Sequence, residues 1–335
     1  MRTAPYALRV DDHGLQICHC HRSGDTHVAD FAAGDLTGFA AWLSRQPREA
    51  RYRLAFDLAD EHYQIESMPR ARGADRRALI ARRFAAHFGD SPVRWTHALG
   101  MDADAARQEK IVLHGLARSA ALAPWLSMLE RNGARLEAIC PATLLMGHFA
   151  PRTLKLDGRL LFVSFTRCGM RVSQIERGVV HFSRLVPGVR SLADDWLHEL
   201  DRTRGYLSAQ PGGTDELRLI VLDPAPKDGA ASPLGDRGIG GGIERIAATR
   251  LLPAGAVPTT TSMAAIEAAQ LHWLARAPRA LHCSTARGRT AAGAERLHHI
   301  ALYGGAVAVA GAVAIAGFRW TDAAALEHQA TAVAT

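Results

Sequence analysis

Hydrophobic and polar residues alternate from Tyr6 to Phe31, which predicts short strands joined by tight turns. The predicted strands are Tyr6–Val10, Leu15–His21 and Thr26–Phe31. The turns between them are rich in Asp, Gly and Ser, residues that favour turns. A helical spacing of apolar residues follows at Leu36–Arg45, and a fourth strand is expected at Arg51–Leu58.

The next stretch changes character, because strands and helices then alternate. The predicted strands are Tyr63–Met68, Val93–Leu99, Lys110–His114 and Leu136–Cys140. The predicted helices are Asp75–His87, Ala117–Arg131 and Pro141–Phe149, the last with proline in its first turn. We place the boundary of the first lobe after this helix, at residue 152, with residues 61–100 as an insert.

The order of elements then begins again. Three strands are predicted at Leu160–Phe165, Met170–Ile175 and Val179–Leu185, and a buried strand at Leu217–Leu222. The predicted helices are Ser191–Leu207, with Asp194 in the capping-box position, Ile239–Arg250 and Thr261–Arg276. The order β-β-β-α-β-α therefore occurs twice, over 6–150 and 159–276, without a repeat at the level of residues.

One segment near the C-terminus has the length and polarity of a membrane crossing. Ile300–Phe318 contains nineteen residues without a charge, Asn, Gln or Pro. A helix of that length spans about 28 Å, close to the hydrocarbon core of ~30 Å. We predict a single transmembrane helix here, and the alternative is a buried core helix.

Charges and small residues around this segment set its orientation and its packing. Arginines crowd the N-terminal side, and only Arg319 follows directly after it, so we expect the N-terminal bulk in the cytoplasm and residues 319–335 in the periplasm. Arg287, Arg289 and Arg296, in a linker spanning residues 278–299, are expected to attract anionic lipid. A small-residue stripe that would allow homodimers through this helix consists of Gly304, Ala308, Ala312 and Ala316.

Composition narrows the function classes. Among 335 residues, 48% are hydrophobic and 22% charged, which predicts a folded chain. The net charge of +7 is spread along the chain without a basic block that has interleaved aromatics, so nucleic acid is not an expected partner. Five scattered cysteines do not form a disulfide framework, which favours a reducing compartment. The N-terminus lacks the apolar core of a signal peptide.

The doubled β-β-β-α-β-α order resembles the ribonuclease-H-like lobes of the actin and Hsp70 superfamily. With one membrane crossing added, the chain resembles the L protein of type II secretion systems. It also resembles the actin-like pilus assembly protein PilM, which has the same body without the crossing. The residues that carry the likeness are the Tyr63–Pro69 strand, the arginine-rich helix after it, the Val93–Leu99 strand and the Leu160–Leu185 meander. The short tail departs from the secretion L proteins and puts their periplasmic role in doubt here.

This resemblance implies an α/β fold of two actin-like lobes, residues 1–152 and 153–277, plus one transmembrane helix. It implies a bitopic scaffold of the bacterial inner membrane in a type IV pilus or type II secretion-like apparatus, which docks other assembly proteins and is not an enzyme. The alternative is an ATP-binding protein or nucleotide switch that uses the cleft between the lobes.

In nucleotide-binding relatives, two Asp-x-Gly hairpin turns hold the phosphates and magnesium. Here the first turn contains Asp12 and Gly14, which also suit an ordinary hairpin. The second turn contains Gly169 but no carboxylate, and the place of the adenine loop is rich in proline. We therefore expect no cofactor, with ATP and Mg²⁺ as the alternative held by Asp12, Gly14 and Gly169.

Four other motifs have both a chemical and an ordinary interpretation. The Gly238–Gly242 run before a helix suits phosphate or a plain loop. Alternation puts Cys18 and Cys20 on one face of a strand and His19 and His21 on the other, which disfavours a zinc site. Acid–base chemistry or solvated loop charges would account for Asp57, Asp60, Glu61 and His62. The arginines of one predicted helix either form a solvent-exposed face or dock an acidic partner or lipid headgroups; they are Arg76, Arg77, Arg82 and Arg83.

Overall fold

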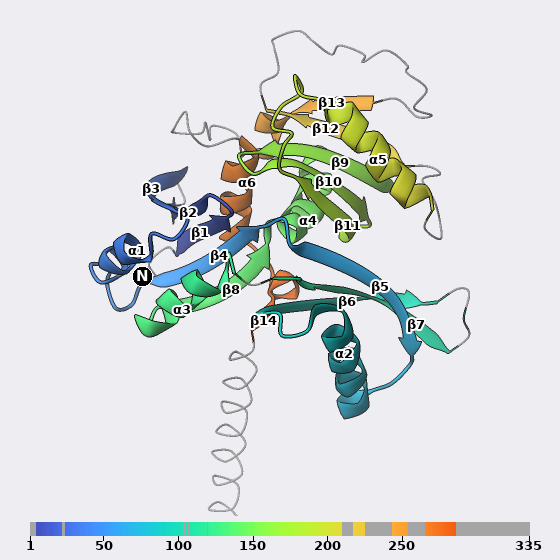
Figure 1. Cartoon of the computed structure of the whole chain (residues 1–335), viewed down its shortest axis with the longest axis horizontal. Helices are drawn as coiled ribbons and strands as arrows, with labels where there is room; N and C mark the ends of the chain where they lie inside the picture. The colour runs from blue at the N-terminus through green and yellow to red at the C-terminus, as the bar shows by residue number, and fades with distance from the viewer. Residues whose placement is uncertain are drawn as a thin grey trace, which may run out of the picture. The chain divides into compact units, whose positions relative to one another are not determined.

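Two five-stranded sheets with the same strand order organise the computed structural model (Figure 1). The first sheet has the order β3-β2-β1-β4-β8 and the second the order β11-β10-β9-β12-β13. In each sheet three strands form an antiparallel meander, and two further strands join it in parallel. The order of elements is doubled as predicted, except that β13 stands where a helix was expected, and the sheet topology is that of a ribonuclease-H-like fold.

The structure describes residues 5–21, 24–102, 105, 107–118, 120–209, 217–224, 243–253 and 265–285. The strands of the first sheet are β1 (Tyr6–Asp11), β2 (Gly14–His21), β3 (Gly24–Ala32), β4 (Arg51–Asp57) and β8 (Arg135–Pro141). The strands of the second are β9 (Arg159–Thr166), β10 (Gly169–Glu176), β11 (Val179–Val186), β12 (Arg218–Asp223) and β13 (Ile243–Ala247). The chain divides into one unit over Met1–Ser284 and a second over Thr285–Thr335.

Helices cover both faces of each sheet because the strands are apolar on both sides. The outer face of the first sheet packs on α1 (Leu36–Leu43) and α3 (Ala123–Arg131), through Phe39 and Trp125. The outer face of the second packs on α5 (Trp196–Ser208). Between the two sheets lie α4 (Ala142–Leu154) and α6 (Ala265–Leu274), and one hydrophobic cluster includes residues of both helices and both sheets. The sheets therefore share a core rather than forming separate globules.

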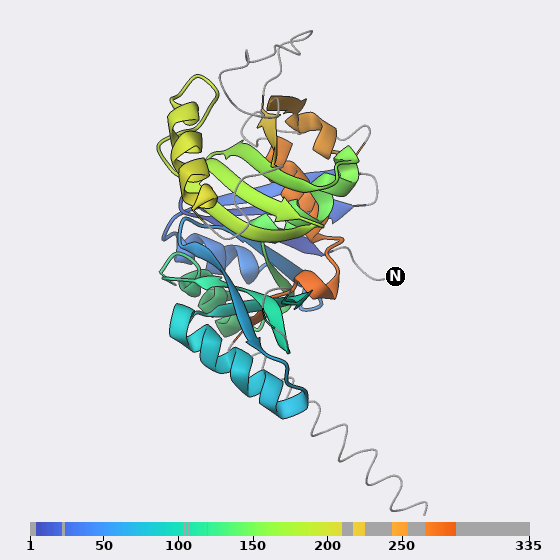
Figure 2. The same cartoon turned by 90° about the vertical axis from the view of Figure 1, so that its right-hand side faces the viewer.

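A third sheet is formed mainly by the chain segment between β4 and β8, two strands that pair with each other in the first sheet. It has the order β14-β6-β7-β5 and contains β5 (Glu61–Pro69), β6 (Val93–Met101), β7 (Gln108–Leu116) and β14 (Ser284–Thr285). Helix α2 (Gly73–Phe88) packs on it through Phe84 and Phe88, which form a small separate core with Met68. Figure 2 shows α2 on the far side of this sheet from the two five-stranded sheets. We call β5, α2, β6 and β7 the insert.

Several predicted boundaries are wrong. The segment predicted as a helix over Ile239–Arg250 instead contains β13 and a 3-10 turn at Ala248–Leu251, because Ile243–Ala247 pairs in parallel with β12. Helix α5 begins at Trp196, five residues later than the predicted Ser191. The Asp194 carboxylate does accept the Ser191 N–H, the bond that a capping box makes, but in a turn before the helix. Helix α3 begins at Ala123, six residues later than the predicted Ala117.

The predicted membrane crossing at residues 300–318 lies outside the described residues. Among the residues that the structure does describe, no helix has the length and apolar character that a membrane crossing needs.

Candidate functional site

Two hairpin turns of the five-stranded sheets meet at the interface between them. The first joins β1 to β2 through Asp12 and His13, and the second joins β9 to β10 through Arg167 and Cys168. The ring nitrogen Nε2 of His13 lies 3.1 Å from the Arg167 carbonyl oxygen. The strand registers make the turns equivalent, because Asp11 faces Gly14 as Thr166 faces Gly169. Arg167 in the second turn is thus the counterpart of Asp12 in the first.

The two turn glycines have one structural cause. Gly14 and Gly169 have φ angles of 136° and 135°, a region that L side chains rarely adopt. A Cβ atom on Gly14 would lie 1.9 Å from the Phe31 carbonyl oxygen, and one on Gly169 would lie 2.3 Å from the Val186 carbonyl oxygen. The third strand of each meander therefore requires glycine at these positions, whether or not a phosphate binds.

An ion pair joins the two turns. The Arg167 guanidinium donates two hydrogen bonds to the Asp11 carboxylate, at 2.6 and 2.8 Å. Asp11 also pairs with Arg9, which lies on the same face of β1. Because Asp11 is buried and Arg167 is partly exposed, the pair lies at the edge of a buried cluster.

Behind this pair the charges are fully buried. Arg9 is 0% exposed and donates to Asp57 at 2.6 Å and to Gln270 of α6 at 3.1 Å. Arg171 of β10 donates to Asp57 at 2.8 Å and to the Leu58 carbonyl oxygen at 2.9 Å. The ionic network comprises three guanidiniums and four carboxylates, namely Arg9, Arg167, Arg171, Asp11, Asp57, Glu61 and Glu267. It joins the first sheet, the second sheet and α6.

Burial and neighbouring charge act in opposite directions on the pKa values of these groups. Burial alone would raise the pKa of Asp57, but the charges of Arg171 and Arg9 outweigh it and hold the pKa below its ordinary value. Asp11 follows the same rule: burial opposes ionisation, and the hydrogen bond from Arg167 and the charge of Arg9 lower the pKa. Both carboxylates are therefore ionised at neutral pH.

The backbone donors that a phosphate would need at these turns are bonded to the protein itself. The N–H of His13 donates to Asp11 at 2.9 Å, and the N–H of Arg167 donates to Glu267 at 2.9 Å. The N–H of Cys168 donates to the Thr166 hydroxyl at 3.3 Å. Phosphate binding at turns relies on free N–H groups that point at the anion. A phosphate here would have to displace two carboxylates and one hydroxyl from these three donors.

The network extends into the insert through Glu61 at the start of β5. Glu61 accepts the Leu58 N–H at 2.9 Å and lies 3.4 Å from Arg171. Its other oxygen accepts the Thr143 hydroxyl of α4 at 2.9 Å, and that hydroxyl lies 2.5 Å from the Tyr63 hydroxyl. Burial, with the charge of Glu61 adding to it, raises the pKa of Tyr63 well above its ordinary value. One chain of polar contacts therefore connects the insert with both five-stranded sheets.

The structure divides the predicted acid cluster. Asp57 and Glu61 are 1% and 2% exposed and belong to the ionic network, so their interpretation as solvated loop charges is wrong. Asp60 pairs with the exposed Arg118, and His62 is exposed. The four residues do not converge on one acid–base group.

Asp12 stays outside the network. Its side chain is exposed to solvent on one side. Desolvation by the protein on the other side, together with the charge of Asp11, raises the pKa of Asp12. The nucleotide site proposed from sequence, with Asp12, Gly14 and Gly169, is thus brought to one interface, but its centre is occupied by Arg167 and Asp11.

In the Cys18–His21 run, where alternation disfavours a zinc site, Cys18 is buried and His19 is half-buried on β2. The side chains of Cys20 and His21 lie outside the described ones. No group of three metal-ligating side chains occurs within the ranges that the structure describes.

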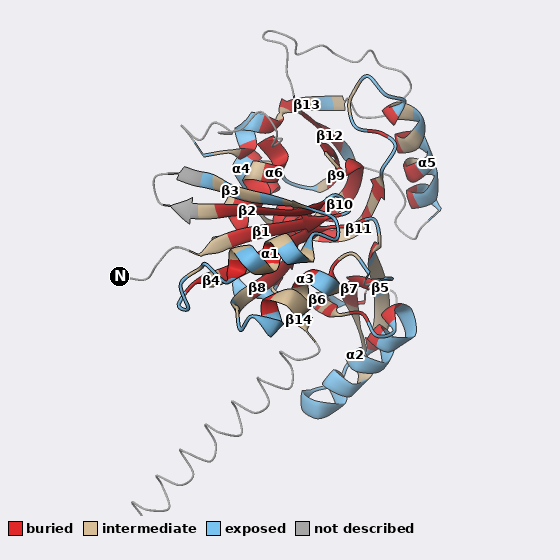
Figure 3. Ribbon diagram, turned by 60° about the vertical axis from the view of Figure 1, so that its left-hand side comes forward, coloured by how far each residue is buried: buried red, intermediate tan, exposed pale blue. Residues whose placement is uncertain are grey.

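The arginines of α2 have different surroundings. Arg76 pairs with Glu109 at 2.8 Å, and Arg83 lies 3.5 Å from Glu66. Arg77 and Arg82 are exposed. Figure 3 shows most of the outer surface of α2 as exposed. The Gly238–Gly242 loop lies outside the described residues. So do the residues predicted to contact lipid or to pack in the membrane, which are Arg287, Arg289, Arg296, Gly304, Ala308, Ala312 and Ala316.

Sequence reasoning missed the arginines and Glu267 of the network. A signal did exist, because Arg9 lies between the apolar Leu8 and Val10, and Arg171 lies between Met170 and Val172. Likewise Glu267 is the one charge in the buried helix α6. A charge in a strand or helix that is apolar all round indicates a buried partner of opposite sign.

No family model matches the chain, and no curated protein matches it. Solved structures do. A chain of the PilM–PilN type IV pilus biogenesis complex is 14% identical, with a TM-score of 0.54, over 84% of this chain and 100% of that one. The cytoplasmic domain of EpsL, an inner membrane component of the type II secretion system of Vibrio cholerae, is 12% identical, with a TM-score of 0.43, over 82% and 95%.

A Bacteroides thetaiotaomicron protein with an actin-like ATPase fold is 9% identical, with a TM-score of 0.39, over 68% of this chain and 84% of that one. The match to the PilM–PilN chain and the doubled strand order together identify the fold. The α/β part of the predicted fold class is confirmed: the chain has an actin-like, ribonuclease-H-like fold.

Proposed function

We propose that this chain is a scaffold component of a type IV pilus or type II secretion-like assembly apparatus, and that its actin-like body docks other assembly proteins. Fold alone does not assign a function. The likeness to the PilM–PilN chain supports the choice of apparatus. The observation that carries the scaffold role is the ion pair between Arg167 and Asp11, which occupies the centre of the interface where a nucleotide switch would hold its phosphates.

The charge balance of the interface supports the same proposal. The ionic network holds four carboxylates and three guanidiniums, and exposed Asp12 adds a further carboxyl at its edge. A triphosphate would bring several negative charges to a centre that already carries an excess of carboxylates. Buried ion pairs are costly to break, because each partner is left as an uncompensated charge. A nucleotide would therefore bind weakly, because the free energy needed to open the network would offset its favourable contacts.

The proposal includes a membrane anchor. Residues 300–318 would cross the bacterial inner membrane once, with the N-terminus in the cytoplasm, and the stripe beginning at Gly304 would allow a homodimer. Arg77 and Arg82 on the exposed side of α2 would contact an acidic partner or lipid headgroups. An alkaline phosphatase fusion after residue 335 should be active only if that end reaches the periplasm.

Two measurements on the full-length chain test the scaffold role. Calorimetric titration with ATP and Mg²⁺ should show no binding tighter than tens of micromolar. Tight binding that Asp12→Ala abolishes, and that Asp90→Ala at an exposed position leaves intact, would replace the scaffold with a nucleotide switch.

Affinity purification of the chain from its native membranes, followed by mass spectrometry, should recover pilus or secretion assembly proteins. Arg77→Glu combined with Arg82→Glu tests the α2 face. The matched control reverses two exposed arginines between α1 and β4, Arg45→Glu with Arg48→Glu. Recovery of no assembly protein by the parent chain would contradict the proposal.

A further inference from the structure

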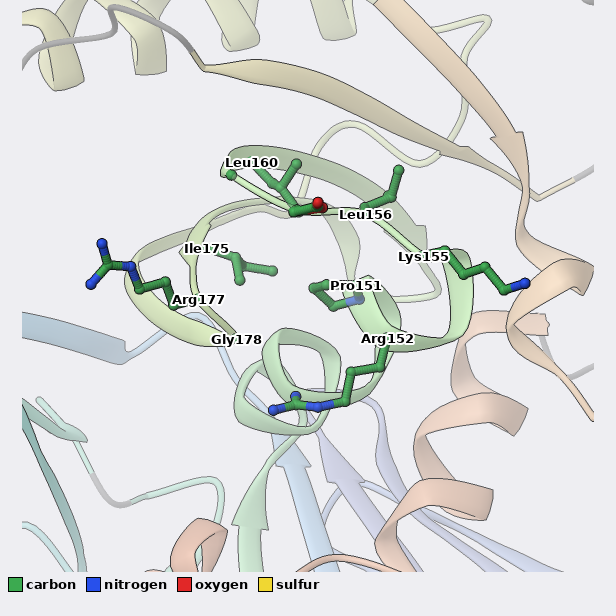
Figure 4. A pocket seen from close by; sticks show the side chains of 10 residues that line it. Pro151, Arg152, Lys155, Leu156, Leu160, Ile175, Arg177 and Gly178 are labelled. Atoms are coloured by element: carbon green, nitrogen blue, oxygen red, sulfur yellow. The ribbon is translucent and has the colours of Figure 1, made fainter.

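A cavity of about 490 Å³ opens in the second sheet, away from the two hairpin turns (Figure 4). It lies at the start of β9, the β10–β11 turn and the C-terminal end of α4. Leu160 faces Ile175 across β9 and β10 here, whereas Thr166 and Gly169 mark the opposite ends of the same two strands. The cavity is therefore distinct from the ionic network. Its volume is typical of ligand pockets, which run from about 300 to 1,000 Å³.

The floor of the cavity is apolar. Pro151, Leu160 and Ile175 line it, and all three are buried. Leu156 lines the cavity as well and is half-buried. An apolar lining favours an apolar occupant, because moving the occupant's own apolar surface from water into the cavity releases free energy of about 25 cal/mol per Å².

The rim of the cavity is basic. Arg152, Lys155 and Arg177 line it and are exposed, and Asp157 is the one carboxylate among the lining residues. Figure 4 shows the charged ends of the three cations pointing in three different directions around the opening. A compact anion such as phosphate is held by cations that converge on one point. This rim instead presents positive charge on several sides of an apolar centre.

The wall is fixed by local backbone geometry. Lys155 ends α4 with a φ of 56°, and Arg177 has a φ of 51° in the β10–β11 turn, a conformation that non-glycine residues adopt at a cost. A Cβ atom on Gly178 would lie 3.1 Å from the Arg152 guanidinium, which packs over that glycine and donates to the His148 carbonyl oxygen. The rim is thus held by the turn and the helix end rather than by a long loop.

We propose that this cavity docks a peptide segment of a partner protein, with one apolar side chain in the cavity and acidic residues on both sides of it. The apolar floor selects the anchor, and the cations that surround it select its neighbours by charge. The inference goes beyond the proposed function, because it requires neither a pilus nor a secretion apparatus. Its failure would leave the scaffold role untouched.

A phage-displayed library of short random peptides, selected on the full-length chain, tests the proposal. Selected peptides should share one apolar residue with Asp or Glu on both sides. Their affinity, measured by fluorescence anisotropy, should fall about tenfold or more in Lys155→Glu and in Arg177→Glu. Lys155→Arg and Arg177→Lys keep the charge and should retain the affinity.

Controls separate the cavity from general electrostatics and from misfolding. Arg250→Glu reverses an exposed charge in the 3-10 turn after β13, outside the cavity lining, and should leave the affinity unchanged. The urea midpoint of each variant should match that of the parent chain. The proposal is overturned if no peptides are enriched, if they lack the acidic and apolar pattern, or if both charge reversals leave binding intact. Displacement by millimolar inorganic phosphate would also overturn it, in favour of a small-anion site.

Discussion

Arg167 of the second hairpin turn donates two hydrogen bonds to Asp11 of the first strand, at 2.6 and 2.8 Å. The strand registers make Arg167 the counterpart of Asp12, so a position that carries a carboxylate in one turn carries a guanidinium in the other. The two turns therefore bind each other. This pair connects the ionic network to solvent, and its behaviour can be tested from both ends.

Removal of Arg9 should be severely destabilising. Arg9 is fully buried and faces Asp57, Asp11 and Glu267, so Arg9→Met removes a counter-charge that all three carboxylates share. Breaking a buried ion pair from one side costs about 3–5 kcal/mol. Urea unfolding followed by circular dichroism should show this loss. Arg118→Met, at the exposed pair with Asp60, should leave the midpoint unchanged, and equal effects of the two substitutions would refute the network.

The free energy of unfolding should decrease in acid, because Asp11 and Asp57 become protonated. Asp11 and Asp57 have pKa values below the ordinary 3.8, so their contribution to the free energy of unfolding is complete well above that pH. It is lost as the pH falls from 3.8 through the folded pKa values. Urea midpoints at about pH 7, 5, 4 and 3 measure the loss. Arg167→Gln should make the acid decrease shallower, because the pKa of Asp11 then moves back toward its ordinary value, and an identical profile would contradict this account.

Alanine at either turn glycine should prevent close pairing of the meanders. Gly14→Ala and Gly169→Ala each combine a positive φ with a backbone carbonyl within 2.3 Å of the new Cβ atom. Strain of this kind costs about 1–3 kcal/mol before the clash is added. Gly34→Ala is the matched control, since Gly34 has a φ of 84° but nothing within 4 Å of an added Cβ. If thermal unfolding gave the control the same loss, the strand approach would not be the cause.

The strand order was predictable from sequence, and the interface was not. Alternation from Tyr6 to Phe31 marks three strands because each residue faces one side of the sheet. The same rule would place the side chain of Arg9, between Leu8 and Val10, in solvent. Its burial depends on Asp57, which is 48 residues away and therefore invisible to a local pattern. The β13 strand was missed for a similar reason: Ile243 and Ile246 suit one face of a helix, and only pairing with β12 makes the segment extended.

Buried thiols should resist modification in the folded chain. Burial raises the pKa of Cys140 and of Cys168 to about 12, so little thiolate forms at neutral pH. Cys18 and Cys283 are buried as well. In Cys20→Ser, Ellman's reagent should react slowly with the native chain and at once with all four thiols in urea. Rapid reaction of the native variant would show that the interface opens readily.

The Thr143 hydroxyl should be the sensitive link between the insert and the rest of the fold. It donates to Glu61 at 2.9 Å and lies 2.5 Å from the Tyr63 hydroxyl, so Thr143→Val leaves two buried polar groups without this partner. An unsatisfied buried group costs about 1–3 kcal/mol, whereas Thr143→Ser keeps the hydroxyl and should cost far less. Urea unfolding measures both.

A double-mutant cycle with Tyr63→Phe then tests whether the contacts act as one unit. If the Thr143 hydroxyl stabilises the fold through Tyr63 as well as Glu61, the combined loss in Thr143→Val with Tyr63→Phe should be smaller than the sum of the single losses. Strict additivity would mean that Thr143 and Tyr63 contribute separately. In that case the insert would be held to α4 by packing alone, and the polar chain from Tyr63 to Arg171 would not couple it to the ionic network.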